Sequence, residues 1–241
     1  MLTRFENAAA AMSEMRLHQE QVANNLANAS TTGYKKDQFF TEALNERLTK
    51  DGAPRSDRSI QQNNDLSGGS LKKTGNPLDV ALGDEGFFVT QPRGGGAERY
   101  TRAGHFVVGS EGTLRTPEGR EVMGEGGPIQ IPVEDGGEVS ISEGGRITAG
   151  QEEVGALRVA TFENPEQLER TEGASFVAGD AQPQAAEDPI VVQGTVETSN
   201  VDPVTELTNM IEHQRQFEAQ QKTIQTTDGV LGRATQSLGG M

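Results

Sequence analysis

Apolar side chains recur at helical spacing near both ends of this chain. Near the start, Phe5, Met12, Gln19 and Leu26 follow one another at intervals of seven, beside a second row of Ala8, Met15, Val22 and Ala29. Two such rows are typical of a helix that packs against a partner helix. Because no glycine or proline precedes Gly33, the pattern predicts an N-terminal helix of about 26 residues, near 39 Å long.

The C-terminal segment repeats the pattern with a more polar seam. The segment Asn200-Val201-Asp202-Pro203 offers a polar cap and a first-turn proline, which together predict a helix start. The seven-residue row that follows is Met210, Phe217, Ile224, Leu231 and Leu238, and its companion row is Leu207, Gln214, Gln221, Asp228 and Thr235. Since the companion row is mostly polar, the helix has too narrow an apolar face to be stable alone and needs a partner.

Two partners are possible for these terminal helices. They can close on each other as a hairpin within one chain, or they can pack against helices of other chains in a polymer, and the heptads alone favour neither. If they form an assembly interface, the expected contact residues are Phe5, Met12, Val22, Leu26, Met210, Phe217, Ile224 and Leu231.

The middle of the chain has a different pattern. A polar stretch from 51 to 70 predicts an extended linker. From Leu78 onward, short apolar runs, among them 87–89, 129–133 and 157–162, alternate with glycine turns and predict strands. The predicted fold class is therefore α+β, with terminal helices in a coiled-coil assembly region and a middle all-β domain. The expected parts are an N-terminal helix 1–32, a linker 33–65, a β domain 66–200 and a C-terminal helix 201–241.

Charge and composition argue against some classes of binding partner. The net charge is −15, and residues 66–200 contribute −12 of it, from 10 Lys or Arg and 22 Asp or Glu. Such an acidic surface repels nucleic acid and anionic lipid. No run approaches the roughly 20 apolar residues of a membrane span, and the start lacks the pattern of a cleaved signal peptide. Composition alone would place the protein in the cytoplasm.

Candidate chemistry is sparse. Cysteine is absent, which excludes disulfides and thiolate sites. His18, His105 and His213 lie in three separate segments without ligand spacing, so we expect no metal site. We also expect no cofactor and no catalytic residue, because no reactive constellation converges. Asp79 stands between apolar neighbours, and its role stays open.

Several motifs are specific to one family. The segment 21–35, from Gln21 to Lys35, resembles the N-terminal signature of the flagellar rod and hook protein family. Further similarities follow in order at 75–82, 86–89, 100–106, 112–119, 194–201 and 210–224. The modest length and the segment 126–132 resemble the proximal-rod type, with the distal-rod type as the alternative.

The resemblance implies a structural subunit that is not an enzyme. It implies export without a cleaved signal peptide, through the flagellar type III export apparatus, and assembly in the periplasm with other copies and other rod proteins. A different class, a non-flagellar β binding module with a helical stalk, would need exposed aromatic clusters. Two tyrosines and no tryptophan argue against that class.

Overall fold

The chain forms two compact units. A computed structural model describes residues 2–43, 47–48, 54–55, 58–83, 85–132 and 139–238, with side chains described for 10–39, 63–83, 85–132, 139–226 and 229. The helical unit comprises Met1–Ala27, Phe39–Gln61 and Asp202–Met241, and the globular unit comprises Asn28–Gln38 and Gln62–Val201. The globular unit therefore includes residues 28–38, which the sequence pattern divided between helix and linker.

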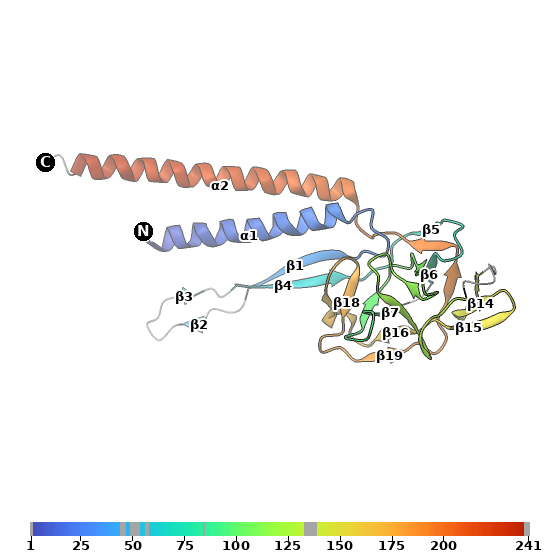
Figure 1. The fold of residues 1–241 in the computed structure, drawn as a ribbon. Helices are drawn as coiled ribbons and strands as arrows, with labels where there is room; N and C mark the ends of the chain where they lie inside the picture. The colour runs from blue at the N-terminus through green and yellow to red at the C-terminus, as the bar shows by residue number, and fades with distance from the viewer. Residues whose placement is uncertain are drawn as a thin grey trace. The chain divides into compact units, whose positions relative to one another are not determined.

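Two long helices lie side by side in the helical unit and run in opposite directions (Figure 1). They are α1, Leu2–Ala27, and α2, Pro203–Leu238. Asp202 caps α2, since its carboxylate accepts hydrogen bonds from the Val204 backbone N–H at 3.0 Å and the Thr205 hydroxyl at 2.8 Å. This side-chain cap followed by a proline is the start signal expected from the sequence.

The segment 33–65, expected to be an extended linker, carries paired strands. Strand β1 (Lys36–Ala43) pairs with β4 (Arg58–Asp65), and β2 (Arg47–Leu48) pairs antiparallel with β3 (Pro54–Arg55). Pairing satisfies backbone groups that a single extended chain would leave to water. The residues of this segment outside the described ranges are 44–46, 49–53 and 56–57.

A large antiparallel sheet organises the described part of the globular unit. Its main path runs β17-β18-β8-β7-β11-β10-β9, with β12 beside β11 and with β16 joining β7 to β19. The bounds are β7 Phe87–Gln91, β8 Arg99–Thr101, β9 Val107–Val108, β10 Leu114–Arg115, β11 Glu121–Gly124, β12 Gly127–Pro128, β16 Val159–Phe162, β17 Glu169–Arg170, β18 Ser175–Val177 and β19 Pro183–Ala185.

Smaller sheets complete this unit. Strands β13, β14 and β15 form a three-stranded sheet, β20 pairs with β6, and β21 pairs with β5. Their bounds are β5 Leu71–Lys73, β6 Val80–Leu82, β13 Val139–Ile141, β14 Arg146–Ala149, β15 Glu152–Ala156, β20 Val191–Gln193 and β21 Thr195–Glu197, and a short 3-10 helix covers Pro165–Gln167. The β21–β5 pair brings residues near both ends of the unit's sequence together.

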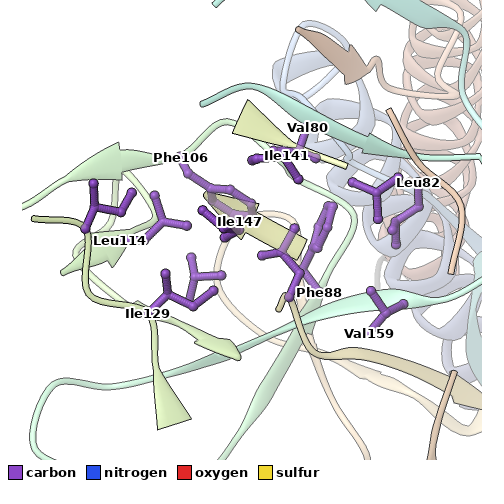
Figure 2. Close-up of a cluster of buried hydrophobic side chains, with 13 residues drawn as sticks. Val80, Leu82, Phe88, Phe106, Leu114, Ile129, Ile141, Ile147 and Val159 are labelled. Carbon is purple, nitrogen blue, oxygen red and sulfur yellow. The ribbon is translucent and has the colours of Figure 1, made fainter. Parts of the chain in front are cut away.

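Both faces of β7 are buried, which explains its unbroken apolar run. On one face, Phe88 packs in a cluster with Val80, Leu114 and Ile147, and its ring meets Phe106 edge to face at 5.2 Å (Figure 2). On the other face, Phe87 contributes to a second cluster that also contains Tyr100 and Phe176. The unit is therefore built around one strand covered by two apolar clusters.

One predicted strand is wrong in its described part. The run 129–133 forms no strand over 129–132, although Ile129 and Ile131 are both buried, and residue 133 lies outside the described residues. An isolated bridge links Gln130 to Thr113 there. Burial on alternate positions created the strand-like pattern without a continuous ladder.

Candidate assembly interface

The facing surfaces of α1 and α2 define the helix seam. We use this name for Met15, His18 and Val22 of α1 and Met210, His213, Phe217 and Ile224 of α2. Val22 is buried, and the other six are half-buried. Their spacing of three and four residues keeps them on one face of each helix.

A stacked histidine pair fixes the register of the seam. The rings of His18 and His213 are 5.5 Å apart and within 9° of parallel, and Phe39 meets His18 edge to face at 5.9 Å. Because the helices are antiparallel, this register sets Asn25 level with Glu206, and both side chains are buried. The seam thus combines apolar contacts with buried polar groups.

The structure selects different companion rows from those in the sequence pattern. On α2, Leu207, Gln214 and Gln221 are exposed, while His213 and Gln220 are half-buried. Positions three and four residues along a helix lie on either side of the same face, so the sequence alone does not choose between the two. The seam contains polar side chains, as expected, but His18 and His213 supply them, with the half-buried Gln220 beside the seam.

The expected contact residues occupy several environments. Met12, Leu26, Met210, Phe217 and Ile224 are half-buried and Val22 is buried, with Met12 and Leu26 at the margin of the seam. Phe5 and Leu231 lie within the two helices, but their side chains are outside those the structure describes.

In the globular unit, a buried charge cluster joins residues 28–38 to residues 195–201, which together we name the junction. Lys35 and Glu197 have side chains 0% and 2% exposed and form an ion pair. Arg102 Nη1 lies 3.4 Å from the same carboxylate, and Lys35 Nζ also donates to the Ser67 carbonyl at 2.6 Å. Burial lowers the pKa of Lys35, and the bond to Glu197 offsets part of that shift.

A second ion pair completes the junction. Arg170 Nε lies 2.6 Å from Asp37 Oδ1, and its guanidinium also donates to the Lys35 carbonyl. The same guanidinium lies over the Tyr34 ring, 4.4 Å from the centroid, a favourable cation–π geometry. Burial, followed by the Asp37 carboxylate, raises the pKa of Tyr34 to about 12.

Hydrogen bonds of the backbone also stabilise the junction. The Gly33 N–H donates to the Glu197 carbonyl at 2.8 Å, and the Lys36 N–H donates to Asn200 Oδ1 at 2.7 Å. Gly33 has a φ of +66°, and a Cβ there would lie 2.2 Å from the Ala103 nitrogen. Only glycine fits both the left-handed conformation and this close approach.

Sequence reasoning missed the junction and the histidine stack. Lys35 and Glu197 lie in the segments 21–35 and 194–201 that carry the family resemblance. Nothing in the local pattern of either segment marks them as partners 162 positions apart. The sequence pattern places His18 and His213 in separate segments. The only available signal was that each lies within a predicted helix on a face that needs a partner.

The remaining candidate groups from the sequence are Asp79 and the possible metal ligands. Asp79 is buried, with its Oδ1 2.6 Å from His105 Nδ1 and accepting from Asn76 Nδ2 at 3.1 Å. Across the described residues, no three His, Cys, Asp or Glu side chains cluster as metal ligands. Neither described helix is apolar enough over a sufficient length to cross a membrane.

Three family models match successive parts of the chain. Residues 5–35 match "Flagella basal body rod protein", residues 81–149 match "Flagellar hook protein FlgE/F/G D1 domain", and residues 192–237 match "Flagellar basal body rod FlgEFG protein C-terminal". The first and last matches include all seven residues of the helix seam and residues from both sides of the junction.

Curated relatives extend over nearly the whole chain. A FlgF rod protein of Salmonella typhimurium is 37% identical, with 92% of this chain and 93% of the relative covered. The Caulobacter vibrioides FlgF is 34% identical over 90% of each chain, and an Agrobacterium fabrum FlgG is 31% identical over 96% of this chain and 97% of the relative. With such identity over nine tenths of both chains, this chain belongs to the flagellar basal-body rod protein family, whose members are structural subunits and not enzymes.

Proposed function

We propose that this chain polymerises through its paired terminal helices as a subunit of the proximal rod, the drive shaft of the flagellar motor. The observation that carries the proposal is the helix seam, in which two of the seven residues are histidines and only Val22 of the seven is buried. Such a pair gains modestly from packing within one chain. Contacts with neighbouring subunits would remove the remaining half-exposed seam from water.

Family membership supports the location and partners in this proposal. Rod proteins of this family are part of the flagellar basal body, and they assemble with other rod proteins. For this chain we infer assembly in the periplasm after export through the flagellar type III apparatus, without a cleaved signal peptide. We propose no cofactor for this chain.

The proximal type is favoured over the distal type by sequence identity, 34–37% for the FlgF relatives against 31% for the Agrobacterium FlgG. We expect the chain to restore swimming to a strain that lacks FlgF and not to one that lacks FlgG. Swimming rings and isolated basal bodies would be compared, with a type III export mutant as the control in which the chain stays in the cytoplasm. Rescue of only the FlgG strain would assign the chain to the distal rod.

Phe217 is proposed as an anchor of the helix seam. Phe217→Ala removes the largest apolar side chain of α2, and for a half-buried ring we expect a loss of about 2 kcal/mol in helix pairing, below the roughly 3–5 kcal/mol of a fully buried one. On heating, the helical circular dichroism signal of the variant should be lost at a lower temperature than that of the native chain. The melting temperature of the globular unit should stay unchanged. Basal bodies per cell and swimming should decrease.

The matched control is Glu212→Ala on the same helix, at an exposed position. Its position is rotated away from the seam, and surface substitutions of this kind are usually close to neutral. If Phe217→Ala assembles as well as Glu212→Ala at equal cellular levels, the seam is not needed for the rod.

A further inference from the structure

α2 has a second apolar face, which we name the outer stripe: Val204, Leu207 and Ile211. These side chains are 73%, 50% and 47% exposed. At about 100° per residue the outer stripe lies roughly 120° around α2 from the helix seam. It is therefore not covered by the α1 of its own chain, and three aligned large apolar side chains in water favour association.

A matching surface occurs on the outward face of α1, about 140° from its seam residues. This face carries Ala23 and Ala27, both exposed, followed toward the N-terminus by Glu20 and Arg16. The side chains of Arg16 and Glu20 are 67% and 57% exposed and form an i,i+4 pair at 3.8 Å. Small side chains at one end allow close helix approach, and charges of both signs follow.

The two faces are complementary when they meet antiparallel. The order Leu207, Ile211, Arg215, Glu218 on α2 then faces the order Ala27, Ala23, Glu20, Arg16 on α1. Large apolar side chains meet alanines, Arg215 meets Glu20, and Glu218 meets Arg16. Opposite charges align at both charged positions, which sets register and partner choice in helix pairs.

We infer that the outer stripe of one copy binds the outward face of α1 in a second copy, so that α2 lies between two α1 helices. This inference rests on the proposed function and adds to the helix seam a second contact, between copies of the chain. Because the outward face of α1 points away from its own α2, one chain does not satisfy both surfaces. Two different complementary surfaces on one chain give a heterologous contact, which generates open chains or rings rather than a closed dimer.

Engineered cysteines test this contact directly, because the chain has none of its own. The double variant Ala23→Cys, Ile211→Cys would be expressed in place of the native chain, and isolated basal bodies oxidised with copper–phenanthroline. We expect dimers and higher multimers of this chain alone on non-reducing gels. The control is Ala23→Cys with Glu212→Cys, which lies about 100° around α2 from Ile211 and should remain monomeric.

The outcomes separate this inference from the proposed function. Monomers only in basal bodies that contain the chain, or cross-links to a different protein, would overturn the inference and leave the rod assignment intact. Absence of the chain from basal bodies of swimming cells would instead remove the proposed function.

Charge reversal gives an independent test. Glu218→Arg sets two arginines against each other in the proposed register, so we expect loss of swimming, and adding Arg16→Glu should restore it. Both side chains are exposed in the monomer, so helical circular dichroism should not change. Glu212→Arg makes the same change of charge at a position outside this face of α2, and cells that carry it should swim normally. A Glu218→Arg defect that Arg16→Glu leaves unrepaired would contradict the pairing.

Discussion

Glu197→Ala should destabilise the globular unit by about 3–5 kcal/mol, the usual loss when one member of a buried ion pair is removed. The substitution leaves Lys35 and Arg102 buried without their shared carboxylate, and it also removes the acceptor for the Gly69 N–H at 2.8 Å. The pKa of Lys35, already lowered by burial, should decrease further. Urea unfolding of the purified chain measures the loss.

The control for this prediction is Glu153→Ala. Glu153 Oε1 lies 3.7 Å from Arg146 Nη1, and both side chains are more than half exposed. Exposed pairs contribute about 0–1 kcal/mol. Equal losses for the two variants would mean that the junction is not held by its buried charges. Glu197→Gln keeps the hydrogen-bond acceptor and the shape of the side chain but removes its charge. Its loss of stability should therefore lie between that of Glu197→Ala and that of the control.

Gly33→Ala should prevent stable folding of the junction. A non-glycine residue at a φ of +66° costs about 1–2 kcal/mol, and the added Cβ would meet the Ala103 backbone nitrogen at 2.2 Å. Relief of that contact requires separation of the Gly33 N–H from the Glu197 carbonyl, a bond of 2.8 Å. We expect a total loss well above the conformational part, measured by thermal and urea unfolding.

Two other glycine-to-alanine substitutions separate the conformational cost of a positive φ from the cost of the steric contact. Gly119→Ala, at a φ of +86° with nothing within 4 Å of the new Cβ, should lose only the conformational 1–2 kcal/mol. Gly144→Ala, with open space and no unusual φ, should be neutral or slightly stabilising. A Gly33→Ala loss no larger than that of Gly119→Ala would show that the backbone around Ala103 yields easily.

The sequence by itself determined the parts that depend on local periodicity. Heptad spacing and the lack of breakers before Gly33 predicted α1, the Asn200 to Pro203 signal predicted the start of α2, and apolar runs between glycines predicted a β-rich middle. These features are local because each is specified by residues within a few turns or one strand. The family motifs likewise lie in contiguous segments.

Tertiary structure decided which residues meet. It paired α1 with α2 in one chain, although heptads fit a hairpin and a polymer equally well. It chose His213 over Gln214 for the seam, because positions three and four along a helix are equivalent until a partner sets the rotation. It also joined Lys35 to Glu197 across 162 positions. Burial of a charge depends on what the rest of the chain places around it, and no local pattern carries that information.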